Sequence, residues 1–406
     1  MARALLAILL MIISHTTPAS HYDWHIDPAK PETGVLRLAL ETPLKDDTIF
    51  ITRQTGPAAA DIFPHCENLD EALQTSGQGW KVPAGCSAIT WSVAFTTIES
   101  PTIDLAEQSN LHHPQGWWLL TEWGALLRPE SQETYATVCA RLEEASTCRP
   151  MPEPHQPPLF LLAGEPDLTR RFADISFRFF HAMLPADFDP TKLHDSLEHQ
   201  LTYLTSLVPR EKRAASIPAE IDVLILGIDQ SLDRVGGAAG HTAYLVNVAV
   251  GDDGISSTEL VRLLWITGHE LFHLLGLDSA PLWTAESLAH YYGYKSMEAS
   301  EKAQQLFDRM LEDLPEMGLL QAHRRVTRQG EGQYYGLFYT RGAAFWRALD
   351  EHLSESTGSE YNLDAFLPML REHEFGPNGE LPAVFIDTLS KHIEPSILNQ
   401  LLDKYL

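Results

Sequence analysis

Two histidines and a glutamate lie close together in the segment HELFHLLG, residues 269–276, with a spacing typical of a metal centre. His269 and His273 are four residues apart, so on a helix both imidazoles project from one face and can bind one ion. Glu270 lies beside such an ion, where its carboxylate can accept a proton from metal-bound water. Zinc lowers the pKa of bound water from about 15.7 to about 7. The spacing therefore predicts a zinc site for hydrolytic chemistry at neutral pH.

The surrounding residues predict the helix that positions these groups. STELVRLLWITGHELFHLLG, residues 257–276, begins with a cap-forming Ser-Thr pair and ends at a glycine. This helix is strongly apolar, and two histidines and a glutamate would be costly to bury on it without a metal. We therefore expect His269 and His273 to be zinc ligands and Glu270 to be a general base.

One candidate for the third ligand follows the glycine. The segment HELFHLLGLD resembles the matrix-metalloprotease type of metzincin, in which a third histidine follows the aspartate. Here Ser279 stands in that position, and Asp278 is one residue out of register. A metzincin also has a methionine turn soon after the zinc helix, whereas the next methionine, Met297, lies in a helical pattern.

The other candidate is Glu286 in PLWTAESLAHYYGY, residues 281–294. This segment resembles the Trp-x-x-Glu-Gly-x-Ala-x-Tyr segment of gluzincin metallopeptidases, as found in the glycyl-aminopeptidase family and, more distantly, in the membrane-alanyl-type aminopeptidases. The resemblance implies that Glu286 is the third zinc ligand, although Ser287 replaces the usual glycine. Without a metal, Glu286 would be an ordinary acid that the helix dipole favours in a first turn. His290, four residues later, is expected at an exposed helix position or as a partner of a zinc histidine.

A second motif supports the gluzincin resemblance. QYYGLFYTRGAAFW, residues 333–346, resembles the Tyr-x-Lys-Gly-Ala helix of the same families, with Arg341 in place of the lysine. In those families the tyrosine donates a hydrogen bond to the oxyanion of the tetrahedral intermediate. The resemblance assigns this role to Tyr339, and Tyr334 and Tyr335 are nearby alternatives.

One family feature is missing from the sequence. The aminopeptidases carry a Gly-x-Met-Glu-Asn segment, or a Gly-Gly-Leu-Glu-His version, whose glutamate grips the free amino terminus of the substrate. VGGAAGHTAYLVN, residues 235–247, has Ala238, Ala239 and Gly240 where that acid should fall, and His241 offers no negative charge. The strand that follows can still pair with an extended peptide. We expect a peptide or protein substrate, and the choice between exopeptidase and endopeptidase stays open.

The fold class expected is α+β, with an N-terminal β-sandwich-like domain followed by a thermolysin-like, mostly helical zinc-peptidase domain. Short runs such as GVLRLAL and SAITWSVAF between turn residues predict the β-rich part, and from residue 259 the pattern is almost all helical. The domains expected are a signal peptide (1–19), a β-rich domain (20–184), a catalytic domain with the zinc helix (185–320) and a C-terminal helical part of the catalytic region (321–406).

Composition limits the partners and the compartment. Arg3 precedes an apolar run from Ala4 to Ile13, which predicts a secretory signal peptide and an exported, periplasmic or secreted protein with no membrane span in the mature chain. Four cysteines lie in the first 150 residues, and 66/86 and 139/148 are the simplest disulfide pairs. The net charge of −26 argues against nucleic acid as a partner. A rival interpretation is an inactive, peptide-binding or scaffolding protein, but the chain retains all three expected ligands and the base.

Overall fold

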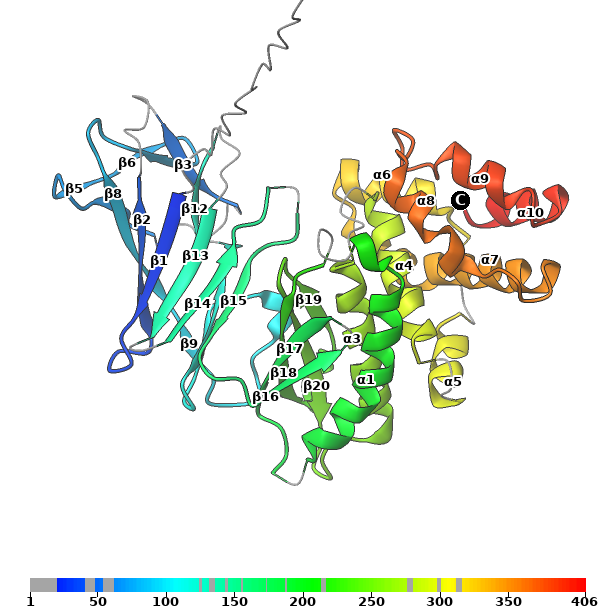
Figure 1. Ribbon diagram of the computed structural model, residues 1–406, viewed down its shortest axis with the longest axis horizontal. Helices are drawn as coiled ribbons and strands as arrows, with labels where there is room; N and C mark the ends of the chain where they lie inside the picture. Colours follow the sequence, from blue (N-terminus) through cyan, green and yellow to red (C-terminus); the bar gives the residue numbers. More distant parts are fainter. Residues whose placement is uncertain are drawn as a thin grey trace, which may run out of the picture.

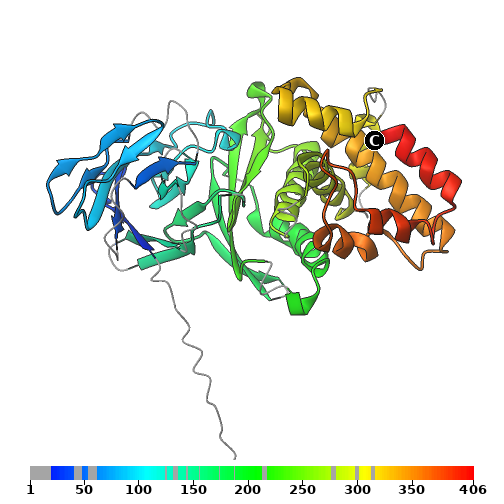
Figure 2. The ribbon, with the colours of Figure 1, turned by 90° about the horizontal axis from the view of Figure 1, so that it is seen from above.

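The computed structural model describes residues 20–406 apart from 41–47, 54–61, 124–125, 131–135, 143–144, 155, 173, 187, 213–216, 276–279, 298–300 and 312–315. The predicted signal peptide (1–19) and the metzincin-type positions Asp278 and Ser279 lie outside the described residues. The chain forms three parts in a row: N-terminal sheets, a central sheet and a group of helices (Figure 1). The same order is visible from above (Figure 2).

The N-terminal part contains three sheets. The largest has the order β14 (Ala145–Pro150), β13 (Ala136–Leu142), β1 (Ser20–Ile26), β2 (Thr33–Ala39), β8 (Ala88–Ala94), β4 (His65–Cys66) and β5 (Glu71–Ala72). The second has the order β15 (Phe160–Ala163), β11 (Trp117–Thr121), β10 (Leu111–His113) and β9 (Thr96–Thr97). The third has the order β12 (Leu127–Pro129), β3 (Ile49–Thr52), β7 (Gly79–Lys81) and β6 (Gln74–Ser76).

Alternation of apolar and polar residues explains how these sheets pack. In β2, Leu36 and Leu38 are buried while Val35 is exposed, so one face covers the core and the other meets solvent. Disulfides join Cys66 to Cys86 and Cys139 to Cys148, which confirms the predicted pairing.

The central sheet lies between the other two parts. Its order is β16 (Leu168–Phe172), β17 (Ile175–Ala182), β18 (Glu220–Asp229), β20 (Ala243–Val250) and β19 (Gly237–Ala239). β17, β18 and β20 run parallel, and β19 is antiparallel at the edge. Both faces of β18 and β20 are buried, as their continuous apolar sequences predict. Alternate residues such as Ile225 and Leu226 pack toward the helices and toward the N-terminal sheets, respectively.

Helices dominate the rest of the chain. They are α1 (Pro190–Ser206), α3 (Ser257–His273), α4 (Leu282–Lys295), α5 (Glu301–Met310), α6 (Leu319–Gln329), α7 (Ala343–Ser356), α8 (Leu367–Glu372), α9 (Ala383–Leu389) and α10 (Pro395–Tyr405). A π-helical turn, η6 (Phe338–Gly342), leads directly into α7. The sheet-rich N-terminal region and the helical C-terminal part agree with the predicted α+β class. None of the helices described is long and apolar enough to cross a membrane.

Candidate metal and catalytic site

The helix α3 holds the two histidines. It begins at Ser257, as the sequence predicts, because the side chain of Ser256 accepts a hydrogen bond from the backbone N–H of Glu259 and caps the helix. Leu263 and Leu271 anchor one face of the helix in the core. At its C-terminal end the Nε2 atoms of His269 and His273 lie 3.1 Å apart.

The next helix, α4, brings Glu286 to the same point. Its Oε2 atom lies 3.5 Å from Nε2 of His269 and 3.6 Å from Nε2 of His273. A point equidistant from three atoms at these separations lies about 2 Å from each, which is the usual length of a bond from zinc to nitrogen or oxygen. Two imidazole nitrogens and a carboxylate oxygen that converge in this way fit a zinc ion. They form the one group of potential metal ligands found among the described residues.

Packing around α4 fixes the position of Glu286. Near the end of α4, the buried Lys295 ammonium pairs with Asp350 of α7 at 2.7 Å and with Asp364 at 2.8 Å. In the middle of α4, Ser287 is buried and its hydroxyl accepts a hydrogen bond of 2.7 Å from Nε1 of Trp346. A Cβ atom on Gly342 would lie 2.4 Å from Cβ of Ser287, so the glycine allows η6 to approach α4 closely. The serine that replaces the usual glycine is thus accommodated by a glycine on the facing helix.

The surroundings of the two glutamates shift their pKa values in opposite directions. Burial would raise the pKa of Glu286, but the two facing histidines outweigh this effect and hold that pKa well below its usual value. Glu286 is therefore ionised, as a ligand must be. Burial raises the pKa of Glu270, although His269 and His273 oppose the shift. Glu270 lies beside β19, where a Cβ atom on Gly237 would lie 2.8 Å from Oε1 of Glu270. A residue larger than glycine at position 237 would displace the expected base.

Two tyrosines face the histidines from the other side. The ring of Tyr339, in η6, lies 5.7 Å from the ring of His269, and the ring of Tyr335 lies 5.5 Å from that of Tyr339. The phenols of Tyr335 and Tyr339 line the same cavity as Glu286, whose negative charge adds to the effect of burial on their pKa. Burial raises the pKa of both phenols, so both remain protonated donors at neutral pH.

The remaining residues near the motifs are arranged differently. Tyr334 accepts a hydrogen bond of 2.8 Å from Arg325 and does not line the cavity. Arg341 donates to backbone carbonyls of α10, including that of Tyr405 at 3.4 Å, and so points away from the histidines. The expectation of an exposed His290 is wrong: its ring is packed 5.6 Å from that of His269 and 5.1 Å from that of Tyr339. No hydrogen bond between His290 and His269 is seen in the described part of the chain.

The two histidines, the two glutamates, Tyr335 and Tyr339 line a cavity of about 650 Å³. One wall carries the three expected ligands together with Glu270, Tyr335 and Tyr339. Another wall is the edge strand β19. A third wall comes from the N-terminal part and consists of Gln108, Trp123, Gln156, Pro157 and Pro158. Sequence reasoning missed this third wall, because its residues belong to three separate segments and carry no motif. His241 is not a lining residue of the cavity; its backbone N–H donates to the carbonyl of Pro158 at 2.7 Å.

The edge strand β19 has backbone groups that can pair with an extended peptide. The N–H of Asn247 donates to the carbonyl of Gly236, and the N–H of Gly240 donates to the carbonyl of Ala243. Backbone groups alternate in direction along an antiparallel strand, so those of Gly237 and Ala239 point away from β20, toward the open edge. No other described strand pairs with this edge.

Comparison with known protein structures identifies the fold. No protein-family model matches the sequence, and no curated protein is detectably similar to it. The crystal structure of an aminopeptidase N family protein from Idiomarina loihiensis matches with a TM-score of 0.68, over 94% of this chain and 75% of that chain, at 12% identity. This chain has the aminopeptidase N fold. The predicted resemblance to gluzincin aminopeptidases is thus confirmed at the level of fold.

Two further structures with weaker similarity are of a variant M1 zinc metallopeptidase from Deinococcus radiodurans. The one bound to a Tyr-Ser-Ala substrate has 14% identity and a TM-score of 0.48, and the other has 15% identity and a TM-score of 0.49. Each match covers 94% of this chain and 92% of the other. Within the aminopeptidase N fold, the chain brings His269, His273 and Glu286 together and places Glu270 and Tyr339 in the same cavity.

Proposed function

We propose that the protein is an exported zinc metallopeptidase that hydrolyses peptide bonds. His269, His273 and Glu286 hold the zinc, Glu270 is the general base, and Tyr339 stabilises the oxyanion. The observation that carries the proposal is the convergence of two imidazole nitrogens and one carboxylate oxygen within 3.6 Å of one another, with Glu270 and Tyr339 lining the same cavity.

The chemistry divides between the metal and the chain. When bound, zinc polarises the attacked carbonyl and lowers the pKa of a water molecule to about 7. Glu270 accepts the proton of the attacking water and then donates it to the leaving amine. Its buried site excludes most solvent, so the carboxylate is a stronger base than an exposed one. Tyr339, a protonated phenol, donates a hydrogen bond to the negative oxygen that develops on the carbonyl.

Peptide binding is assigned to β19. The outward backbone groups of Gly237 and Ala239 can pair with an extended substrate, as in other complexes formed by strand addition. Pairing of this kind aligns the backbone of the substrate and is independent of its side chains. The glycine at 237 leaves room for the base beside the strand.

Two alternatives make different predictions. An inactive peptide-binding protein of the same fold would bind peptides without cleaving them, and a metzincin-like endopeptidase would use a ligand from the segment after α3. The geometry favours the gluzincin set, because Glu286 faces both histidines.

Hydrolysis of a peptide mixture by the purified, zinc-loaded protein tests the proposal. Products are identified by mass spectrometry, before and after removal of zinc with a chelator. The Glu270→Gln variant keeps the shape of the side chain and all three ligands but loses the proton acceptor. It should bind zinc like the parent and turn over at least about 10²-fold more slowly. A zinc-loaded parent that binds peptides without cleaving any would support the inactive alternative, and full activity in Glu270→Gln would refute the mechanism.

Export is the other part of the proposal. It is supported by the leader sequence in residues 1–19 and by the two disulfides, which are typical of oxidising compartments. The mature chain is expected to begin near Ser20 or His21. The purified protein, denatured without reductant, should show no titratable thiol, whereas four thiols would contradict this part of the proposal.

A further inference from the structure

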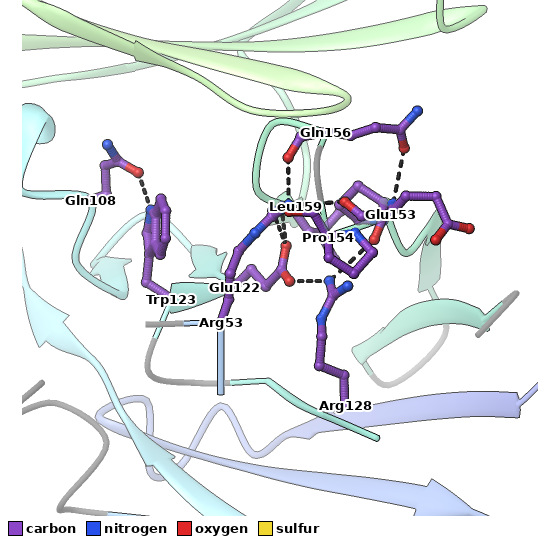
Figure 3. A network of polar contacts seen from close by, with 10 residues as sticks. Arg53, Gln108, Glu122, Trp123, Arg128, Glu153, Pro154, Gln156 and Leu159 are labelled. Atoms are coloured by element: carbon purple, nitrogen blue, oxygen red, sulfur yellow. Dashed lines mark hydrogen bonds and ion pairs between the residues drawn. The ribbon is translucent and has the colours of Figure 1, made fainter. Parts of the chain in front are cut away.

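The cavity wall from the N-terminal part presents amide groups and an aromatic ring. Nε1 of Trp123 donates a hydrogen bond to Oε1 of Gln108 (Figure 3). The backbone N–H of Glu153 donates to Oε1 of Gln156 at 2.9 Å. Because both amide oxygens are engaged, the NH₂ groups of Gln108 and Gln156 are the polar atoms that remain to face a ligand. Such groups donate hydrogen bonds to carbonyl oxygens and are poor partners for an ammonium.

Behind this wall lies a buried cluster with an excess of positive charge. Glu122 is fully buried and pairs with both Arg53, at 2.8 Å, and Arg128 (Figure 3). Glu122 also accepts a hydrogen bond of 2.9 Å from the N–H of Leu159. The side chains of both arginines are about nine-tenths buried. Two guanidinium groups therefore face one carboxylate, and water screens little of the resulting net positive charge in this buried site.

Arg53 connects this cluster to the cavity. Its Nη2 atom donates to the carbonyls of Glu153 at 2.9 Å, of Pro154 at 2.8 Å and of Gln156 (Figure 3). Its Cζ atom lies 5.8 Å from the ring centroid of Trp123. Arg53 thus fixes the loop that forms the wall, and its charge lies directly behind the aromatic lining residue.

The acid next to Gln108 in the chain is already engaged. Glu107, next to Gln108 in the chain, pairs with Arg234 at 3.3 Å and is not a lining residue. Glu270 and Glu286 are the acids among the described residues that line the cavity, and the proposed function uses both. An ammonium group in the cavity would lose its water without gaining a free anion.

We infer that this cleft takes peptide segments without a charged amino terminus, that is, internal segments of a chain or N-acylated ends. The inference rests on the proposed function and adds its substrate class. The amide donors of the wall and the open edge of β19 both match the neutral groups of a peptide backbone. The positive charge behind the wall disfavours an ammonium and tolerates an acidic side chain.

Matched peptide pairs test the inference. Each sequence in the mixture is made with a free amino terminus and with an N-acetyl group, and every carboxyl terminus is amidated. The zinc-loaded parent should cleave the acetylated member of a pair at least as fast as the free one. Cleavage of free peptides alone would overturn the inference and leave the proposed function intact. Cleavage of neither form would overturn the proposed function, and this inference with it.

A single substitution should shift this preference. Gln108→Glu retains an oxygen that can accept from Trp123 and introduces a negative charge into the cavity. It should raise the rate for free peptides relative to acetylated ones by about tenfold over the parent ratio. Gln115→Glu is the matched control, because Gln115 is exposed and is not a lining residue of this cavity. Zinc content and melting temperature show that each variant is folded. An unchanged ratio in folded Gln108→Glu, or an equal shift in the control, would overturn the inference.

Discussion

Replacing Glu286 with alanine tests the proposed metal site most directly, because it removes one of the three proposed ligands. The two imidazole nitrogens remain 3.1 Å apart, but the oxygen that lies 3.5 and 3.6 Å from them is lost. Structural zinc sites bind with about 10–16 kcal/mol in total. One of four coordination positions accounts for about 3 kcal/mol of this, so the Kd for zinc should rise by about 10²-fold.

The assay is a zinc titration against a competing chelator, with elemental analysis after dialysis. The parent should retain near one zinc per chain, and Glu286→Ala should lose most of it. Glu301→Ala is the control, since Glu301 is an exposed acid on α5 and its removal should leave the Kd unchanged. Unchanged zinc affinity in Glu286→Ala, with loss of zinc in Asp278→Ala, would refute this reasoning and support the metzincin-like alternative.

Three other predictions follow from the surroundings of the site. Tyr339→Phe should lower kcat by about 10²-fold with little change in KM, and full activity in this variant would exclude Tyr339 as the oxyanion donor. Tyr335→Phe should weaken zinc binding by about 10- to 100-fold, because it removes a hydroxyl beside the proposed ligand Glu286, whereas Tyr334→Phe should not change the Kd. His194 is buried, and burial lowers the pKa of its imidazole from 6.5 to about 4. The unfolded chain thus binds a proton that the folded chain excludes, so the free energy of unfolding should fall by up to about 3 kcal/mol between pH 6.5 and pH 4. Denaturant titrations should show a shallower loss in His194→Phe, and equal losses in the two proteins would contradict this assignment.

The parts of the site that the sequence predicts depend on local geometry. A cap and an apolar period define α3, and a spacing of four residues places His269 and His273 on one face whatever surrounds the helix. The same rule could have identified Tyr335, which precedes Tyr339 by four residues and lies beside it in the structure. Only the fold shows that Tyr334 pairs with Arg325 instead. Neither spacing nor propensity carries that information.

The N-terminal wall depends on contacts between distant segments. Arg53 bonds to the carbonyl of Gln156, which is 103 residues away in the chain, and to the side chain of Glu122, which is 69 residues away. Sequence patterns describe one element at a time, so they predict that such segments are strands and loops but not that they meet. The sequence alone shows Ala238, Ala239 and Gly240 where the aminopeptidases have their amine-binding acid. It does not show the positive charge that lies behind the opposite wall.

The two halves of the chain thus have separable roles at one cavity. The expected ligands and base lie between residues 269 and 286, on two helices whose contacts are mostly with the helical core. The wall that faces them is held by Arg53, Glu122 and Arg128, which belong to the N-terminal part and pair with none of the expected ligands in the described part of the chain. Because no hydrogen bond or ion pair between the side chains of the two groups is seen among the described residues, substitutions in one should be nearly additive with substitutions in the other. Changes on α3 and α4 should therefore act on zinc binding and turnover, and changes in the N-terminal wall should act on the choice of substrate.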